Sequence, residues 1–264
     1  MEPRVALIDA DILVYQSAYR CQTTVQWDDE ESTPMADFVE AVEDFDASVQ
    51  HIVQKTGASH AILALTDSAR EANFRRSVWP DYKCHRETKD KSDGRPLLYA
   101  GLRSWVREQY ETHQKRGIEA DDTVGIIATM EQAFTPIICS IDKDLDTVPG
   151  WHFNWNKSDN GVYYVTEDEA ARFHLFQTMT GDSTDNYPGI PGIGQVRATR
   201  YMEQWSELPL WAVWEEIVAL GEERGVTEDF VLSQARCAYI LHATEWDIQN
   251  QKAILWTPPR EEDA

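Results

Sequence analysis

Nine carboxylates in five short clusters are the feature that most constrains the fold of this 264-residue chain. Three of the clusters follow apolar runs of strand length, at residues 5–8, 61–65 and 137–139. Continuous apolar runs are typical of strands buried on both faces, and the functional crevice of an open parallel sheet lies at the carboxyl ends of its strands. We therefore expect the acids to meet at one edge of a parallel sheet. They are Asp9, Asp67, Glu119, Asp121, Asp122, Asp142, Asp144, Asp182 and Asp185.

So many acids at one edge repel one another strongly unless hard divalent cations neutralise them. Mg²⁺ suits such a site because it takes oxygen ligands, retains water and accepts phosphate oxygens. Two such ions about 3.5–4 Å apart can activate a water molecule and stabilise the leaving oxygen of a phosphodiester. The pattern therefore predicts a magnesium-dependent phosphodiesterase, that is, a nuclease. For any single Asp at a strand end, the alternative is a cap of the following helix.

The composition favours a packed core, because 42% of the residues are hydrophobic and the chain has 10 Trp, 10 Tyr and 8 Phe. The N-terminal residues lack the apolar run of a signal peptide, and no stretch approaches the roughly 18 apolar residues of a membrane span. The four cysteines are widely separated, with no CxxC pair, which argues against a zinc site. We therefore expect a cytoplasmic protein with reduced thiols and no membrane partner.

The net charge of −22 is opposite to the basic face usual in nucleic-acid-binding proteins, but the charges are unevenly distributed. Twelve of the 24 Lys and Arg residues lie between Arg70 and Arg116, whereas residues 28–46 hold nine acids and no Lys or Arg. The basic segment predicts a locally positive ridge on an acidic body, with weak non-specific DNA binding that depends steeply on salt. The acidic run is typical of a solvated loop and helix face.

Strands and helices alternate up to about residue 165, which predicts an α/β domain at residues 1–165 with a mostly parallel sheet. Residues 166–264 are predicted to form a helical domain. Expected strands cover residues 4–9, 61–66, 137–141 and, at the sheet edge, 161–165, and residues 28–33 are an expected loop. Expected helices cover residues 12–19, 37–55, 97–110 and 119–130, and then 167–180, 195–204, 210–220, 228–242 and 245–251.

A glycine-rich segment, Gly189-Ile-Pro-Gly-Ile-Gly194, separates two of the expected helices. Glycines let a ligand approach the backbone closely, and the N-terminus of the following helix presents N–H groups to an anion. With Arg197 and Arg200 behind it, the turn at Gly192 and Gly194 predicts a helix–hairpin–helix that grips a DNA backbone. The alternative is a turn that only joins two helices.

The sequence DYKCHR lies in the basic segment, shortly after Arg75 and Arg76. Tyr82 is expected to stack on a base, while Lys83 and Arg86 hold phosphates. The two preceding arginines are expected to be further DNA contacts. An exposed basic helix without a catalytic part is the alternative.

The order of these motifs resembles the 5′-nuclease superfamily, which includes flap endonucleases and the 5′→3′ exonuclease domain of bacterial DNA polymerase I. The motifs are IDAD, TD followed by FRR and YKCHR, EADD, SIDKDLDT and GDSTDNYPGIPGIG, and they span residues 5–200. The whole chain, including the segment ARCAYILHATEWDIQNQKAILWTP, is especially similar to the exonucleases of short-tailed bacteriophages. The resemblance implies a PIN-like α/β domain with a helix–three-turn–helix module packed on it.

The resemblance also implies a role for each acid. The implied ligands of a first metal ion are Asp9, Asp67, Glu119 and Asp121, with Asp122 beside them. The implied ligands of a second are Asp142, Asp144, Asp182 and Asp185. Lys83 and Arg86 would contact the scissile phosphate or its neighbour, although Cys84 stands where the family often has Gly. The implied cofactors are two Mg²⁺ ions, replaceable by Mn²⁺, and K⁺ at the helix–hairpin–helix.

On this basis we expect a divalent-metal-dependent 5′→3′ exonuclease that hydrolyses duplex DNA from the 5′ end as a monomer. Flap cleavage and removal of RNA primers in phage DNA replication are the expected companion activities, in the cytoplasm of a bacterial host. One alternative is a PIN-type endoribonuclease, although such domains usually lack the GIPGIG module. Another is a non-catalytic DNA-binding accessory of replication, although every expected acid is present.

Overall fold

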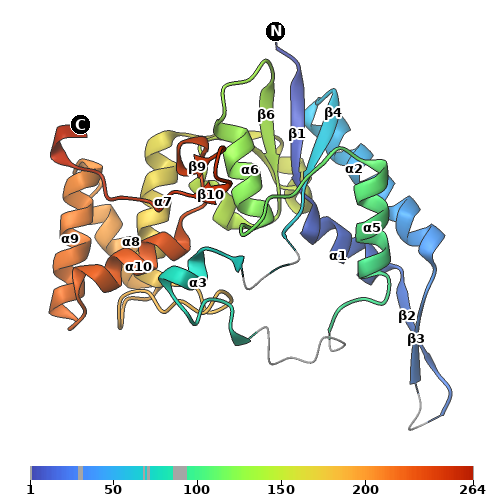
Figure 1. Cartoon of the computed structure of the whole chain (residues 1–264), viewed down its shortest axis with the longest axis horizontal. Coiled ribbons are helices and arrows are strands. Elements are labelled where there is room, and N and C mark those ends of the chain that lie inside the picture. Colours follow the sequence, from blue (N-terminus) through green and yellow to red (C-terminus); the bar gives the residue numbers. More distant parts are fainter. Residues whose placement is uncertain (1, 29–31, 68, 70–71, 86–93, 264) are drawn as a thin grey trace.

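The computed structural model describes residues 2–28, 32–67, 69, 72–85 and 94–263, and its centre is a six-stranded sheet (Figure 1). The strand order is β5-β4-β1-β6-β7-β8, and all neighbours are parallel except the edge pair β7–β8. In chain order the strands are β1 (Arg4–Asp9), β4 (His60–Ala64), β5 (Thr112–His113), β6 (Thr135–Cys139), β7 (Gly150–Phe153) and β8 (Tyr163–Val165). The expected α/β class with a mostly parallel sheet is confirmed.

Alternate residues of β1 contact different helices, because successive side chains of a strand point to opposite faces of the sheet. Ala6 and Ile8 share a core with α1, α2 and α5, whereas Val5 and Leu7 share a core with α6. Asp9 follows Val5 and Leu7 in this alternation, so its carboxylate is directed to the side of α6. The helices are α1 (Ala10–Arg20), α2 (Phe38–Thr56), α5 (Tyr99–Gln109) and α6 (Ala120–Thr129).

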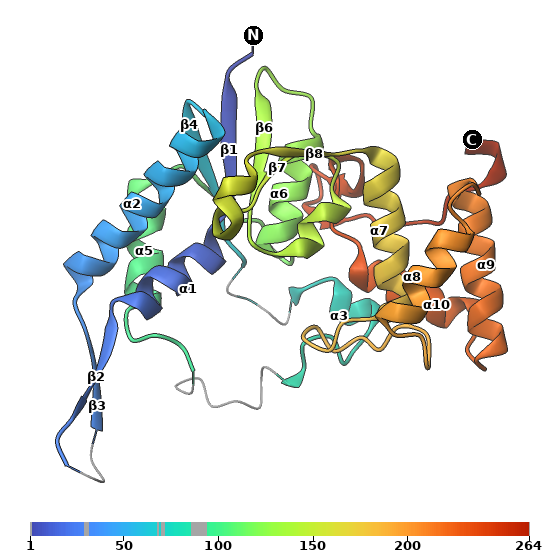
Figure 2. The same cartoon turned by 180° about the vertical axis from the view of Figure 1, so that it is seen from behind.

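Residues 167–238 contain four α-helices with a core of their own (Figure 2). They are α7 (Glu167–Thr180), α8 (Gln195–Gln204), α9 (Leu210–Glu223) and α10 (Glu228–Ala238). Met179, Val213, Ile217 and Val231 are fully buried in this core. The four helices confirm four of the five expected there. No helix in the described part of the chain is long and apolar enough to cross a membrane.

The expected fifth helix, at residues 245–251, is wrong. The segment forms two antiparallel strands, β9 (Trp246–Asp247) and β10 (Lys252–Ala253). The Asp247 carboxylate explains the difference, because it accepts hydrogen bonds from the backbone N–H groups two and three residues later, at 2.9 and 3.0 Å. Such a local bond offers the backbone an alternative to helix formation.

A two-stranded ribbon also projects from the body of the molecule (Figures 1 and 2). Its strands are β2 (Gln22–Gln26) and β3 (Ser32–Ala36), where the sequence predicts only a loop at residues 28–33. Neither strand has a buried residue, so no apolar run marks them in the sequence. The short strands β5 and β7 were missed as well.

Candidate active site

A cavity of about 780 Å³ lies at the carboxyl ends of β1, β4 and β6, where the sequence places its acidic clusters. Eight of the nine expected acids line it, and the exception is Asp122. Asp11, which was not expected, lines it too. The structure thus brings the five acidic clusters of the sequence to one place.

Helix ends and turns fix the orientation of several of these acids. Glu119 is the N-cap of α6, and Asp142 is the N-cap of the 3₁₀ helix η2 (Lys143–Thr147). The Asp142 carboxylate accepts a hydrogen bond from the Asp144 backbone N–H at 2.9 Å. Asp182 accepts from the backbone N–H groups two and three residues later, at 2.5 and 3.2 Å. These acids therefore serve as local caps and also face the cavity.

Asp9 and Asp121 are buried carboxylates that repel each other. Burial, with smaller contributions from Asp11 and Asp142, raises the pKa of Asp9 to about 8. Burial also raises the pKa of Asp121 well above its usual range, with additional contributions from Asp9 and Asp142. Ser140 donates a hydrogen bond to Asp9 at 3.3 Å, which offsets only part of this cost. Both carboxylates thus favour the protonated form unless a cation joins them.

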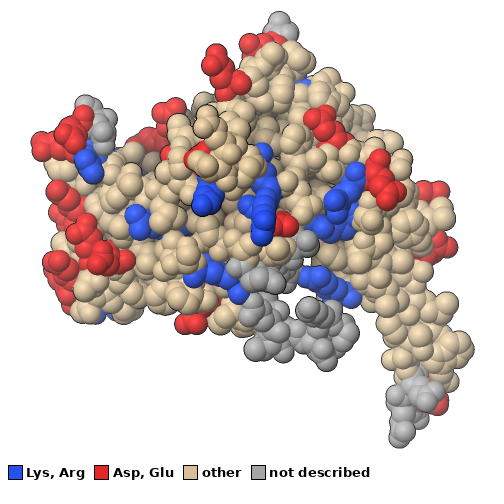
Figure 3. Space-filling model, viewed as in Figure 1, with Lys and Arg blue, Asp and Glu red and all other residues tan. Residues whose placement is uncertain are grey.

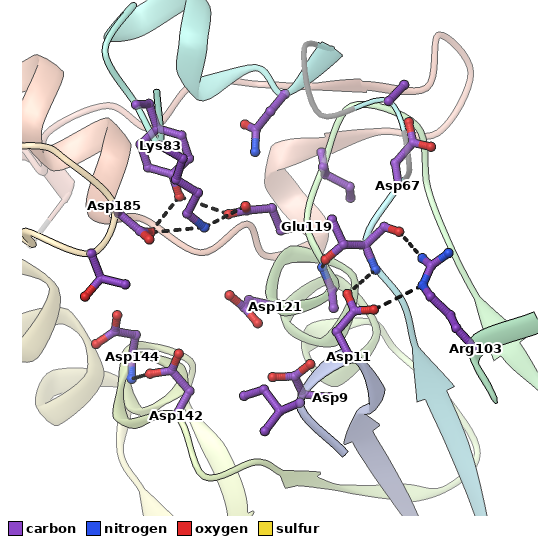
Figure 4. A pocket seen from close by; sticks show the side chains of 18 of the residues that line it. Asp9, Asp11, Asp67, Lys83, Arg103, Glu119, Asp121, Asp142, Asp144 and Asp185 are labelled. Carbon is purple, nitrogen blue, oxygen red and sulfur yellow. Dashed lines mark hydrogen bonds and ion pairs between the residues drawn. The ribbon is translucent and has the colours of Figure 1, made fainter. Parts of the chain in front are cut away.

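Asp144 is a third carboxylate whose pKa is raised. Burial and, next, the Asp142 carboxylate together raise the pKa of Asp144 to about 7. The Gln177 amide donates to the carboxylate at 2.6 Å, and the exposed ammonium of Lys143 lies 3.8 Å away. Figure 4 shows Asp9, Asp121, Asp142 and Asp144 around one shared space.

Glu119 differs, because the protein supplies its counter-charge. The Lys83 ammonium donates to Glu119 at 2.6 Å and lies 3.2 Å from Asp185. The Tyr82 hydroxyl lies within hydrogen-bond distance of the same two carboxylates, at 2.9 and 2.8 Å, and can donate its one proton to either. Burial alone would raise the pKa of Glu119, but Lys83 and Arg75 outweigh it and lower the pKa to about 2. Glu119 is therefore ionised at any ordinary pH.

The donor set fits hard divalent cations, because it consists of carboxylate oxygens. Burial and mutual repulsion at Asp9, Asp121 and Asp144 are the conditions that a divalent cation relieves. Among the residues that the structure describes, no group of three or more Asp, Glu, His or Cys side chains is placed so that it could hold a metal ion without rearrangement.

Arg75 and Asp122 correct two expectations, since they pair with each other outside the cavity. Two parallel hydrogen bonds of 2.7 Å join the guanidinium to the carboxylate, and the two side chains are 3% and 0% exposed. Arg75 also donates to the backbone carbonyls of Cys237 (3.0 Å) and Tyr239 (2.6 Å). Arg75 is therefore no DNA contact, and Asp122 is not available as a metal ligand while this pair is intact.

Tyr82 is a third correction. Its ring is only 2% exposed and packs with Tyr187 and Cys237, so it cannot stack on a base. Its hydroxyl instead holds Glu119 and Asp185, as described above. The basic surroundings of Tyr82 in the sequence gave no signal of this burial.

The structure sets Asp67 apart from the other acids and places Asp11, which the sequence did not suggest, in the cavity lining. Asp67 accepts hydrogen bonds from the Gly117 backbone and the Gln114 amide, both at 3.3 Å, and Figure 4 shows it set apart from Asp9 and Asp121. Asp11 accepts from the Thr66 backbone N–H at 2.7 Å and from Arg103 at 3.3 Å. The IDAD motif contains both Asp9 and Asp11. Because α1 starts directly after Asp9, Asp11 lies in the first turn of this helix, and that position could have identified it as a site residue.

Basic side chains occupy another wall of the same cavity. The arginines that line it are Arg76, Arg95, Arg103 and Arg107. On the face shown in Figure 3, Lys and Arg gather in a band across the middle of the molecule, whereas Asp and Glu lie mainly toward its edges. The expected positive ridge on an acidic body is thus present on this face. Arg86, expected as a phosphate contact, lies outside the described residues.

The GIPGIG segment forms an exposed turn before α8. Ile190 and Ile193 anchor it in the helical core, while Gly192 and Gly194 are exposed. A side chain at Gly194 would meet no atom within 4 Å, so the backbone at the start of α8 is open to a ligand. Arg197 donates to the Gly192 carbonyl at 2.6 Å, and Arg200 is exposed on the same helix. The sequence prediction of an accessible helix N-terminus agrees with this geometry.

Comparison with known proteins gives a family match, two similar phage exonucleases and two similar solved structures. A family model described as the N-terminal resolvase-like domain of 5′-3′ exonucleases matches residues 4–169. The exodeoxyribonuclease of Enterobacteria phage T3 and the exonuclease of Escherichia phage T7 are each 28% identical, over 96% of this chain and 93% of theirs. A T5 5′-exonuclease structure with bound zinc shares the fold, with a TM-score of 0.65, 16% identity and 89% coverage of each chain. A T5 flap endonuclease complex with DNA and metal ions has a TM-score of 0.61, 14% identity and 88% and 87% coverage.

Proposed function

The chain belongs to the 5′-3′ exonuclease family, and from this premise we propose that it hydrolyses duplex DNA from the 5′ end with the help of divalent metal ions. Cleavage of flaps and of RNA primers at the same site would be companion activities. One observation carries the proposal: Asp9, Asp121 and Asp144 face one cavity with raised pKa values and incomplete compensation by the protein's own cations.

We assign the metal ligands by keeping the two ligand sets that the family resemblance implies for those acids that line the cavity. Asp9, Glu119 and Asp121 would hold a first Mg²⁺ or Mn²⁺ ion, and a second would be held by Asp142, Asp144, Asp182 and Asp185. Asp67 remains part of the proposal as an acid at the rim, bonded to Gly117. When bound, the ions supply an activated water and neutralise charge on the phosphate.

Lys83 is the side chain that we propose to act on the reacting phosphate. Its ammonium lies at the cavity wall between Glu119 and Asp185, so it is held close to where a phosphodiester would be cleaved. A positive group at this place stabilises the charge that develops on phosphate oxygens in the transition state. Arg86 is proposed as its companion from the sequence alone.

DNA would be bound through its backbone on two surfaces. The arginine wall of the cavity, with Arg76, Arg103 and Arg107, would contact the strand next to the site. The exposed start of α8, around Gly192 and Gly194, would contact the duplex farther away, and K⁺ is proposed to support this contact.

Three 5′-labelled substrates separate this proposal from its alternatives: a blunt duplex, a duplex with a 5′ flap, and a single-stranded RNA. We expect Mg²⁺ to cause release of short 5′-labelled products from both DNA substrates, and a chelator to stop it. Cleavage of the RNA with intact DNA would point to an endoribonuclease. Binding of DNA with no cleavage under any divalent ion would point to an accessory protein.

A further inference from the structure

A second cavity, of about 450 Å³, lies at the ends of α6 and α7 that are remote from the carboxylates. Thr129, the last residue of α6, and Glu167, the first of α7, line it. At 1.5 Å per residue, the ten residues of α6 put it roughly 15 Å from the acids of the first turn. A molecule bound there would leave the active-site cavity open.

Four rings form much of its wall. His174 of α7 lies 5.0 Å from Tyr239 and 4.9 Å from Trp256 between ring centroids, and Tyr239 lies 5.2 Å from His242. Trp256 belongs to the C-terminal segment, which Figure 1 shows passing from β9 and β10 across α7 toward α9. Arg236 donates to the Trp256 carbonyl at 3.1 Å and holds this segment in place.

The rings are uncharged near neutral pH. Burial lowers the pKa of His174 to about 4, and its Nε2 donates to the Ala235 carbonyl at 2.8 Å, so the neutral imidazole carries its proton on Nε2. Burial also lowers the pKa of His242. The Tyr239 hydroxyl donates to Glu245 at 3.1 Å. The walls therefore present apolar and aromatic surface without a positive charge.

Glu167 gives the cavity a negative charge. Its neighbours in the first turn of α7 are engaged, since Asp168 pairs with Arg172 at 2.7 Å and Glu169 closes a capping box with Thr166. Glu167 is exposed and close enough to His242 to offset a small part of the lowering of the imidazole pKa that burial causes. No Lys or Arg occurs among the described residues that line the cavity. A phosphate or nucleotide is therefore disfavoured here, in contrast to the arginine wall of the first cavity.

We propose that this cavity binds an organic cation that combines a flat apolar ring with an ammonium group. His174, Tyr239 and Trp256 pack on one another, so the ligand ring would lie against the side of this cluster that faces the cavity, and the ammonium would be attracted by Glu167 and by the aromatic surface exposed there. The same chemistry occurs in free aromatic amines and in basic peptides with an aromatic residue, and the test below distinguishes these sources.

Tryptamine and indole-3-propionate are suitable probes, because they share a ring and differ in the sign of their charge. We expect tryptamine to shift the NMR signals of residues around His174 and Trp256 and to bind about tenfold more tightly than the anion. Glu167→Gln should remove most of this preference. The control Glu215→Gln, an exposed acid on α9 outside the cavity lining, should leave it unchanged.

Ala171→Phe provides a second variant, since Ala171 lines the cavity and a larger side chain would fill it. It should abolish binding of tryptamine without loss of cooperative unfolding. Equal affinity for the two probes, binding unaffected by Ala171→Phe, or no binding in the millimolar range would each overturn the proposal. If the acetylated amide Lys-Trp-Lys binds more tightly than tryptamine, the source is a peptide; if it binds more weakly, the source is a free amine.

Discussion

Two groups of buried carboxylates share one cavity and have opposite tendencies to bind a proton. Asp9 has a pKa raised to about 8, whereas Glu119 has a pKa lowered to about 2. Burial acts in the same direction on both, so burial does not explain the difference. The difference is that Lys83 and Arg75 lie close to Glu119, while the neighbours of Asp9 are Asp11 and other acids.

The protein neutralises one part of its active site with its own cation and leaves the other part to ions from solution. Around Glu119 and Asp185 the protein provides a cation, Lys83, in fixed geometry. Around Asp9 and Asp121 it provides almost none, and leaves the charge to be balanced from solution. The first group therefore has part of its charge balanced before any ion binds, although Glu119 and Asp185 are also proposed metal ligands, whereas the charge of the second is balanced only when a divalent ion binds.

The largest effect is expected when an acid whose charge is balanced by a bound metal ion is replaced. Asp144→Asn should lower the single-turnover cleavage rate by on the order of a thousandfold, because one oxygen ligand of the metal site is lost. DNA affinity should be equal or higher, since a charge that repels phosphate is gone. Asp146→Asn is the matched control: Asp146 lies in the same turn but accepts from Tyr163 at 2.7 Å, away from the cavity. Binding weakened a hundredfold with an unchanged rate would contradict the assignment of Asp144.

A large loss of stability is expected at the buried Arg75–Asp122 pair, where the protein balances its own charge. Arg75→Ala should lower the free energy of unfolding by about 3–5 kcal/mol, because it leaves the buried Asp122 without its partner. Arg76→Ala, the adjacent variant, should change stability by less than about 0.5 kcal/mol and instead weaken DNA binding and its salt dependence. Urea unfolding and DNA binding at several salt concentrations would measure both. Equal stability of the two variants would show that the buried pair contributes little.

The pH dependence of stability tests the group that contains Asp9 and Asp121, whose charge is balanced by ions from solution. The native state holds a proton on Asp9 up to about pH 8, whereas the unfolded chain releases it near its ordinary pKa of 3.8. Without metal, stability should therefore fall as pH rises between these values. Mg²⁺ at roughly a hundred times its Kd should restore about 2.7 kcal/mol at the upper end. Asp9→Asn should remove much of both effects, and thermal unfolding that is independent of pH and Mg²⁺ would refute the argument.

A smaller effect is expected for the cation that the protein itself provides. Lys83→Ala should lower the single-turnover rate by roughly 10–100-fold and affinity by less, because its charge acts mainly on the transition state. Arg107→Ala, on the arginine wall, should mainly reduce affinity and the salt slope. If the two variants behave alike in both assays, Lys83 is an ordinary phosphate contact.

The smallest effect is expected at α8, outside the comparison. Gly194→Val should weaken duplex binding by about tenfold, since a side chain would keep phosphate from the backbone N–H groups. The rate at saturating DNA should stay the same. The substitution has space, so folding is expected to be unaffected. Unaltered duplex affinity would show that this segment is only a turn that joins two helices.

The sequence was sufficient to predict the acidic edge of the sheet, because strand ends in a parallel sheet converge whatever the detailed packing. The sequence was insufficient where two adjacent residues of the same type point into different surroundings. Asp121 faces the cavity and Asp122 is buried against Arg75, since neighbours on a helix point about 100° apart. Arg75 and Arg76 diverge in the same way. Which of two neighbours faces the cavity depends on the rotation of a short helix, and that is set by tertiary contacts.

The ribbon and the β9–β10 pair illustrate a second limit. The two strands of the ribbon have no buried residue, so hydrophobic periodicity contains no information about them. At residues 245–251 the apolar spacing favours a helix, but one carboxylate, that of Asp247, binds the backbone locally and prevents it. A hydrophobic pattern extends over many residues, so it does not reveal the effect of one side chain that binds the backbone locally.

The bonds that Arg75 and Asp122 make to residues 237–241 also bear on how this enzyme could be dissected or recombined. Arg75 donates to two carbonyls there, and Asp122 accepts from the Leu241 backbone N–H at 3.2 Å. The nuclease region thus depends on a peptide segment far along the chain to satisfy its own buried charges. A chimera that takes residues 4–169 alone would inherit an ion pair with missing partners, so the natural unit for exchange between relatives extends at least to residue 241.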